Sequence, residues 1–508
     1  MKIMIRKYIL LSILLFPLAY FASVRYVTVP GAGIMNGTSW LNAAPGNSLQ
    51  ATINLANNGD EVWVACGTYF TTNTANRNIS FVMRNGITIY GSFVGNETSL
   101  SQRTLSCGAC TILTGEIGAV GIADNSYHVI SNPVGINNTA VIDGFVVRDA
   151  NDDRPAAGTS GLGGGFYNQG DYTGNFCNPT IRNCVIRNNY AQFGAGIFNS
   201  GSSGGMSSPV ISNCIITANT AYIGGGGIDN FGLGGTASPA LINTIVYGNN
   251  AQQRAGGMYC WGGNNGNASP TLTNCVFANN SAIDGGGIVS DRLNSNTGSS
   301  GNSNPTLVNC IFWGNTASGI GPQFFILGGA SFIATYSDVD LTGQSMPHII
   351  SGSGTGNIHL NPLFTNPISA MGTDNCWLTS DDGLHLQTSS PAINAGTSAG
   401  VPLTDILGLP RDGNPDMGTY EFQTSVSIDE IQGISELNIY PNPTTGIFKI
   451  EGFTSEIKKL TITNSLGELL PFSSKGEGTI DLSYGPNGIY FLYIETSGKA
   501  ITKKIIKK

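Results

Sequence analysis

The sequence predicts an all-β protein, a right-handed parallel β-helix solenoid followed by a small C-terminal β-sandwich. Composition is the first observation: 70 glycines and only 11% charged residues make a chain too apolar for a disordered polymer and too poor in helix formers for a helical protein. A repeat is the second observation. Five related segments follow one another every 30 or 31 residues, and once after 35, each marked by a proline: Pro179, Pro209, Pro239, Pro270 and Pro305.

The repeat unit argues against two other repeat architectures. Its apolar residues lack the 3.6-residue spacing of an amphipathic helix, and Gly or Pro interrupts it every few positions, which excludes helical solenoids. A propeller blade needs about 40 residues and four strands, which these units are not expected to supply. Each unit is therefore predicted to form one coil of two or three short strands, stacked about 4.8 Å above the previous one.

Equivalent positions of stacked coils form columns, and two of these columns are asparagine. Asparagine tolerates the left-handed backbone conformation of a sharp bend, and its amide can hydrogen-bond to the equivalent amide one coil away. We therefore expect structural ladders rather than catalytic groups. The members are Asn183, Asn213, Asn243, Asn274 and Asn309 in one column, and Asn189, Asn219, Asn249, Asn280 and Asn315 in the other.

Two apolar columns are predicted to point into the solenoid. One lies between the two asparagine columns, and the other follows the glycine-rich segment of each repeat. Together they should form the core. Their members are Ile186, Ile216, Val246, Phe277 and Phe312, and Phe166, Ile197, Ile228, Met258 and Ile288.

Short signatures within the repeats resemble a known family. Gly286-Gly287-Ile288 and Phe277-Ala278-Asn279-Asn280 are similar to the GGxI-like and FxxN-like motifs of polymorphic outer-membrane proteins and related bacterial β-helix surface proteins. The resemblance implies a β-helix over residues 24–356. The membrane barrel that ends the classical members is not expected, because only about 85 residues follow Phe422.

The N-terminus and the charge distribution indicate an exported protein. Residues 1–23 read as a signal peptide, with Lys2, Arg6 and Lys7 before an apolar run, although an uncleaved anchor is the alternative. No later stretch is long enough to span a membrane, so no integral span is expected in the mature form. Residues 24–424 carry 22 carboxylates and 11 arginines but no lysine, a net charge of −11. This acidic body argues against binding to nucleic acid and to anionic membranes.

Residues 357–422 differ from the repeats and are expected to cap the solenoid. The stretch resembles the closing region of many secreted β-helix proteins. Arg411, Asp416 and Glu421 could be interpreted as catalytic, but an arginine–carboxylate cluster also satisfies the polar groups of an open coil end. The structural interpretation is preferred.

A linker at residues 423–434 leads to a tail that resembles a second family. The resemblance rests on the turn Tyr440-Pro441-Asn442-Pro443, on Gly446 before a strand, on Gly488 and Tyr490, and on a lysine-rich end. These features are similar to the type IX secretion system C-terminal sorting domain of Bacteroidota, over residues 435–508. The resemblance implies a small β-sandwich, the type IX translocon and its processing peptidase as partners, and a secreted or outer-membrane surface-attached protein.

Seven of the ten cysteines fall into two groups. Cys184, Cys214, Cys275 and Cys310 share one repeat column, with Thr244 in the missing place, and are predicted to be small buried side chains. Cys66, Cys107 and Cys110 are candidates for disulfide bonds because the chain is exported. The CxxC at 107–110 lacks the further ligands that a zinc site needs.

Catalysis is left open, with binding favoured. Neither Gly-His-Gly nor Arg-x-Lys occurs, so the clustered motifs of a galacturonase-like hydrolase are missing, and without lysine a lyase would need Arg, His or Tyr as its base. The cluster Asp149, Asp152, Asp153 and Arg154 could hold calcium beside an arginine, or form a solvated loop. No cofactor is expected, although calcium stays open.

A row of outward side chains favours glycan binding. Strand alternation after each glycine segment directs these side chains away from the core, and stacked aromatic faces suit sugar rings while carboxylates suit hydroxyls. The alternative is that the loops fold over the row and bury it. The candidate ligand-binding residues are Tyr167, Phe198, Asp229, Tyr259, Trp261 and Asp291.

These observations predict a secreted or cell-surface adhesin or glycan-binding protein. The alternatives are a calcium-assisted polysaccharide lyase or glycosidase and a structural surface component.

Overall fold

The computed structural model describes residues 22–423 and 438–508, apart from short gaps at residues 106–109, 120, 157–159, 294–297, 345–353, 452–456, 465–467, 477 and 497–499. The expected signal peptide and linker therefore lie almost entirely outside the described residues, as does Cys107. The chain divides into two compact units, Met1–Phe422 and Gln423–Lys508.

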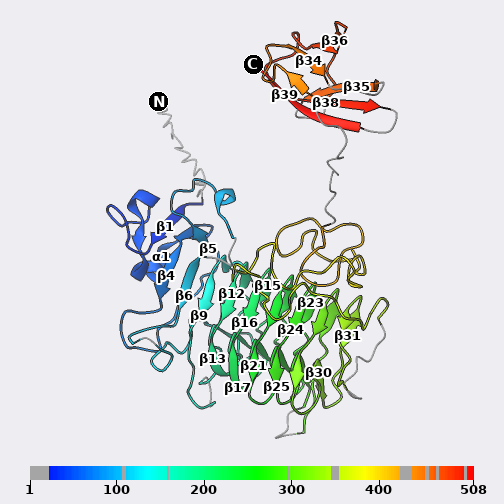
Figure 1. Cartoon of the computed structure of the whole chain (residues 1–508). Helices are drawn as coiled ribbons and strands as arrows, with labels where there is room; N and C mark the ends of the chain where they lie inside the picture. The colour runs from blue at the N-terminus through cyan, green and yellow to red at the C-terminus, as the bar shows by residue number, and fades with distance from the viewer. Residues whose placement is uncertain are drawn as a thin grey trace, which may run out of the picture. The chain divides into compact units, whose positions relative to one another are not determined.

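The first unit is a parallel β-helix (Figure 1). Among the described residues, its named strands pair in parallel into sheets of eleven, nine, seven and five strands. Successive strands of a sheet come from successive coils, so the predicted solenoid is confirmed.

The four sheets run along the solenoid and extend over different numbers of coils. The eleven-stranded sheet contains, in order, β2 (Ala44–Pro45), β1 (Val24–Thr28), β3 (Glu61–Ala65), β5 (Thr88–Phe93), β8 (Val141–Asp143), β11 (Thr180–Arg182), β15 (Val210–Ser212), β19 (Ala240–Ile242), β23 (Thr271–Thr273), β27 (Thr306–Val308) and β31 (Ile333–Thr335). The nine-stranded sheet contains β4 (Gly67–Phe70), β6 (Thr111–Thr114), β9 (Val146–Arg148), β12 (Val185–Arg187), β16 (Ile215–Thr217), β20 (Ile245–Tyr247), β24 (Val276–Ala278), β28 (Ile311–Trp313) and β32 (Asp338–Val339). The seven-stranded sheet contains β7 (Ile130–Asn132), β10 (Phe166–Gln169), β14 (Ile197–Ser200), β18 (Ile228–Phe231), β22 (Met258–Trp261), β26 (Ile288–Asp291) and β30 (Phe324–Leu327). The five-stranded sheet contains β13 (Tyr190–Phe193), β17 (Thr220–Gly224), β21 (Asn250–Ala251), β25 (Ser281–Ala282) and β29 (Thr316–Ala317).

Each central repeat supplies four strands, not the two or three that the sequence predicts. The coil that contains Pro179, for example, contributes β11, β12, β13 and β14. The strands are only two to five residues long, so four of them fit into 30 residues, and the length argument against four strands per unit is wrong.

The asparagine columns hold the turns between these strands. Asn183, Asn213, Asn243, Asn274 and Asn309 all have φ between 45° and 53°, which confirms the left-handed bend. In the second column Nδ2 of each residue donates to Oδ1 of the next at 2.9–3.0 Å, from Asn189 to Asn315. A third ladder, not predicted from the sequence, runs through Asn132, Asn168, Asn199 and Asn230 at 2.9 Å per step.

The core fills the interior of the coils. Both predicted apolar columns are buried in one cluster, and the four cysteines of the repeat column lie in it with free thiols. Cys66 and Cys110, two of the three candidates whose pairing the sequence left open, form a disulfide bond, and Cys376 is also disulfide-bonded.

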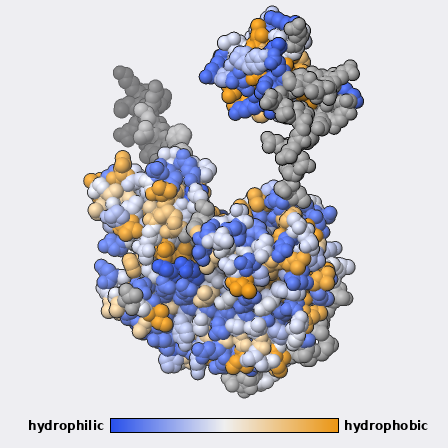
Figure 2. All heavy atoms as spheres, in the orientation of Figure 1, coloured by the Kyte–Doolittle hydropathy of each residue, from blue (hydrophilic) through white to orange (hydrophobic). Residues whose placement is uncertain are grey.

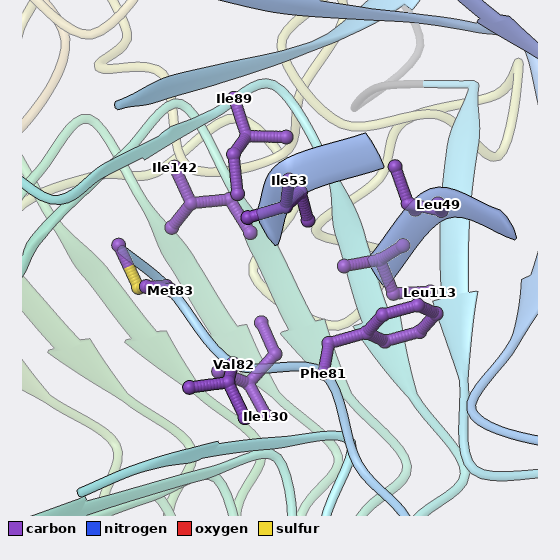
Figure 3. Close-up of a pocket in the computed structure, with 9 residues that line it drawn as sticks. All are labelled: Leu49, Ile53, Phe81, Val82, Met83, Ile89, Leu113, Ile130 and Ile142. Atoms are coloured by element: carbon purple, nitrogen blue, oxygen red, sulfur yellow. The ribbon is translucent and has the colours of Figure 1, made fainter. Parts of the chain in front are cut away.

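An N-terminal helix, not predicted from the sequence, covers the first coils. In α1 (Leu49–Leu55) the side chains of Leu49, Thr52 and Ile53 are buried, a spacing that places them on one helical face. Figure 3 shows Leu49 and Ile53 directed toward Phe81, Ile89 and Leu113. The space left between them is about 10 Å³ and its lining is apolar, so it has room for about one water at most and is not a ligand site. Three short 3₁₀ helices, η1 (Trp40–Asn42), η2 (Gly46–Ser48) and η3 (Leu100–Gln102), complete the N-terminal part.

Residues 357–422, named here the lateral segment, begin on the last coil, where Ile358 pairs with Asp338, but they do not stay at the end of the solenoid as the expected cap would. They pack along the outer face of the nine-stranded sheet (Figure 1). Phe364, Trp377, Leu386 and Tyr420 bury the outward side chains Val146, Val185, Ile215, Ile245, Val276 and Ile311. The reason is that this sheet carries apolar residues on both faces, and the outer ones also need a cover.

The second unit is the predicted β-sandwich. One antiparallel sheet contains β33 (Asn438–Tyr440), β34 (Ile447–Glu451), β37 (Thr479–Asp481) and β36 (Ser473–Ser474). The other contains β35 (Ile457–Asn464), β38 (Gly488–Thr496) and β39 (Ala500–Lys507). Phe448, Ile462, Leu492 and Ile505 lie in the core between them.

Candidate functional site

The outward row of the seven-stranded sheet is not exposed. Tyr167, Phe198, Asp229 and Tyr259 point away from the core as predicted, but they are only 4%, 2%, 1% and 4% exposed. Asp291 is also buried and Trp261 is half-buried. The prediction of an open stacking platform is therefore wrong, and the alternative, a row covered by loops, is confirmed.

The glycine segments themselves form this cover. Gly194 has φ +59°, and a Cβ at this position would lie 2.8 Å from Cβ of Phe198. Gly225, with φ +65°, stands in the same relation to Asp229, also at 2.8 Å. Because glycine alone allows this close crossing, the chain folds flat over its own outward side chains. Below the cover, Tyr259 packs with Ala255, Val289 and Phe325.

Asp229 is sealed in this layer without a partner. Neither carboxyl oxygen has a hydrogen bond, and burial raises the pKa of Asp229 well above its usual value. The group is therefore held in its neutral form, since an isolated buried carboxylate is strongly disfavoured. The Asp291 carboxylate, by contrast, accepts hydrogen bonds from the Tyr259 hydroxyl at 3.3 Å and from the Leu293 amide at 2.9 Å.

The candidate calcium cluster consists of paired charges. Arg154 donates to both carboxylate oxygens of Asp152 at 2.7 and 2.8 Å, and Arg77 pairs with Asp153 at 2.9 Å. The Tyr127 ring lies beneath both guanidiniums, 4.3 Å from that of Arg77 and 3.9 Å from that of Arg154. Across the described part of the chain, no group of three or more His, Cys, Asp or Glu side chains is arranged to hold a metal.

The cluster in the lateral segment is structural. Arg411 Nη1 donates to Glu421 at 2.9 Å, and Nη2 donates to the carbonyls of Gly418 and Thr419 and to Asn243 Oδ1. The Asp416 carboxylate accepts from the Asn394 and Phe422 amides. These bonds tie the segment to itself and to the solenoid, which supports the preferred interpretation.

The outer face of the nine-stranded sheet has an uncovered part near the N-terminal end. Two rows of side chains point outward on this face. In the row nearer the five-stranded sheet, Phe70, Thr114, Arg148 and Arg187 are aligned as direct register partners on β4, β6, β9 and β12. Further along the row, the lateral segment covers Tyr247, whose hydroxyl donates to the Pro367 carbonyl at 2.9 Å. Figure 2 shows hydrophilic residues gathered over β6 and β9, between the N-terminal coils and the lateral segment.

A groove of about 560 Å³ opens at the Phe70 end of this row. Phe70 is 50% exposed, whereas Tyr69 points inward and is buried. Hydroxyl and amide side chains from Asn47, Thr68, Thr72 and Asn73 share the wall with the aliphatic side chains of Val29 and Ile117. A groove of this size that combines an aromatic edge with hydrogen-bonding groups is typical of small-ligand sites.

Two half-buried arginines continue the row beyond the groove. Arg148 Nε lies 3.1 Å from Asp149 Oδ2, and the same oxygen accepts from the Thr114 hydroxyl at 3.3 Å. Thr114 is itself buried, so the accessible groups of the row are Phe70 and the two guanidiniums. This site was not predicted from the sequence, although VVRDA and VIRNN place Arg148 and Arg187 at the same repeat position.

The chain is thus an exported parallel β-helix protein with a sorting tail. Residues 438–508 match the family model described as the secretion system C-terminal sorting domain. The tail is a type IX sorting domain, which directs export to the cell surface or the medium. Within it, Asn442 of the predicted motif donates to the Lys504 carbonyl and accepts from the Ile506 amide, both at 2.8 Å, so the turn that contains Tyr440, Pro441 and Pro443 is fixed to β39. Tyr490 is buried in the core.

Comparison with solved structures gives a distant likeness for the body. The chain is similar to the structure described as the crystal structure of pectate lyase Pel9A, with 14% identity and a TM-score of 0.42, over 79% of this chain and 96% of that chain. No curated protein matches the chain. The likeness of the repeats to polymorphic outer-membrane proteins stays a prediction. No helix among the described residues is long and apolar enough to cross a membrane.

Proposed function

We propose that the solenoid is an extracellular glycan-binding module, carried to the cell surface or released by the type IX system. The observation that carries this proposal is the groove beside Phe70. An exposed aromatic ring offers a stacking surface for a sugar, and the surrounding hydroxyls and amides can exchange hydrogen bonds with its hydroxyl groups. Such a site should bind weakly, with dissociation constants from micromolar to millimolar, since each ring contact contributes on the order of 1 kcal/mol.

A glycan array followed by titration tests the proposal. Phe70→Ala should weaken binding of the best array ligand about fivefold or more, while Tyr222→Ala should leave it unchanged. Tyr222 is a matched control because it is an exposed aromatic residue, 45% accessible, on the five-stranded sheet. Equal affinities of the two variants would contradict the proposed site. Unsaturated oligosaccharides among the products would replace the binding proposal with the lyase alternative.

Processing of the tail is a second part of the proposal. We expect the translocon-associated peptidase to remove the sorting domain, so that the form found on the surface or in the medium ends before residue 438. Mass spectrometry of that form checks this expectation, and recovery of the peptide that covers residues 499–504 from it would contradict the expectation.

A further inference from the structure

The arginine pair next to the groove gives this site a charge preference, an inference that rests on the proposed function. The side chains of Arg148 and Arg187 lie next to each other at their backbone ends, because the two residues are register partners on neighbouring parallel strands. Neighbouring strands lie about 4.8 Å apart, so Arg187 follows Phe70 by about 14 Å along the row. An extended chain that stacks on Phe70 can therefore reach both arginines.

The pair carries more positive charge than its surroundings balance. Asp149 is the carboxylate that pairs with Arg148, whereas the side chain of Arg187 has no ion pair, hydrogen bond or ring contact in the part of the chain that the structure describes. Partial burial and the nearby charge of Arg148 lower the pKa of Arg187, and Asp149 offsets this only in part. The guanidinium stays protonated, because the ordinary pKa of arginine lies far above neutral pH.

This arrangement is unusual in a body that otherwise repels anions. The solenoid and lateral segment carry twice as many carboxylates as arginines, and six other arginines have carboxylate partners. Two adjacent guanidiniums, of which only that of Arg148 has a carboxylate partner, attract a further anion, and the planar donor groups of arginine match a carboxylate or sulfate with paired hydrogen bonds.

We propose that Arg148 and Arg187 form an anion subsite that holds the carboxylate or sulfate group of an acidic sugar chain, whose neighbouring sugar occupies the groove at Phe70. The contact is direct, from guanidinium to anion, and needs no bridging cation. The shared chemistry is a monovalent oxyanion on an extended glycan, either a uronate or a sulfate ester.

Titration with matched polysaccharides tests the proposal. The probes are a polyuronate and its methyl-esterified form, and a sulfated galactan and its desulfated form, all with a chelator present. The wild-type protein should bind one charged form at least tenfold more tightly than its neutral counterpart, and the preferred pair identifies the anion. R148Q/R187Q should lose this tenfold preference and keep the affinity for the neutral form.

Two controls separate charge recognition from other effects. Arg84→Gln removes the same charge at an exposed site outside the groove and should change nothing. R187Q alone should lose most of the preference without a change in the thermal midpoint, because its side chain has no partner to lose. Equal affinity for charged and neutral forms, an unchanged preference in the double variant, or dependence on calcium would overturn the proposal.

A small-anion experiment makes failure of this subsite distinguishable from failure of the proposed function. Inorganic sulfate should raise the thermal midpoint of the wild-type protein by about 1 °C or more through mass action, and should not do so in R148Q/R187Q. If no glycan binds but this difference is present, the glycan function fails and the anion subsite stands. If neutral glycans bind through Phe70 and sulfate has equal effects on both proteins, the glycan function stands and the subsite is overturned.

Discussion

The outer faces of the seven-stranded and nine-stranded sheets differ in what covers them. On the seven-stranded sheet the chain covers each coil with its own glycine segment, so the aromatic row from Tyr167 to Tyr259 is buried along its whole length. On the nine-stranded sheet the cover is a separate stretch, the lateral segment. It leaves Arg148 and Arg187, toward the N-terminal end, uncovered. The difference teaches that strand alternation determines the direction of a side chain, whereas its exposure depends on which segment, near or distant in sequence, packs over it.

The largest expected effect compares one phenylalanine from each face. Phe198→Ala should destabilise the protein by about 3 to 5 kcal/mol, because a buried ring leaves a cavity, while Phe70→Ala should change stability by less than about 0.5 kcal/mol. Differential scanning calorimetry of both variants measures the contrast. Similar small losses for both would mean that the seven-stranded face is open in solution, contrary to its burial here.

Removal of a glycine from the cover should have an intermediate effect. Gly194→Ala adds a methyl group 2.7 Å from the Ile197 carbonyl at a positive φ, which should cost about 2 to 3 kcal/mol. Gly174→Ala is the control, since it has φ +85° but no neighbour within 4 Å, and backbone strain alone should cost about 1 kcal/mol. The thermal midpoints of the two variants measure the difference. Equal losses would remove the close crossing as the reason for these glycines.

The smallest expected effect concerns Asp229 and depends on pH. The unfolded carboxyl ionises above about pH 4, while burial raises the pKa of the folded one, so the folded protein binds more protons and loses stability as pH rises through this interval. Asp229→Asn cannot ionise, and relative to this variant the wild type should lose on the order of 1 kcal/mol of stability between pH 4 and pH 5. Thermal midpoints measured across this pH range check the difference. A gap of the same size at both pH values would show that ionisation of Asp229 is not its cause.

The features that repeat along the sequence could be predicted, and the features that occur once could not. The columns of Asn183 and Asn189 were readable because five copies share a register, and the core columns follow from the same alignment. The position of the lateral segment depends on contacts such as that from Asn309 Nδ2 to the Thr397 carbonyl at 2.9 Å, between residues far apart in sequence. The sorting domain was recognisable from Tyr440–Pro443 because its local motif is distinctive.

The candidate site was predicted on the wrong face because its exposure depends on how other segments pack over it. Tyr167, Phe198 and Tyr259 are aromatic and point outward. The sequence does not show that the glycine segments lie directly against them. Arg148 and Arg187 differ from Thr217 and Tyr247 at the equivalent repeat positions, so alignment by column would have marked them as a change of chemistry along the row. Their exposure still depends on where the lateral segment stops.

The lateral segment also changes how the solenoid can come apart. A stack of coils held only by nearest neighbours can fray from either end, one coil at a time. Here Asn243, Asn274 and Asn309, on three successive coils, donate to carbonyls of Thr404, Gly418 and Thr397 in one continuous stretch of chain. That stretch acts as a splint across the stack, so a coil beneath it cannot open without breaking contacts that its neighbours share. The central coils should therefore melt as one cooperative block, which gives an exported protein few partly opened states for extracellular proteases to cut.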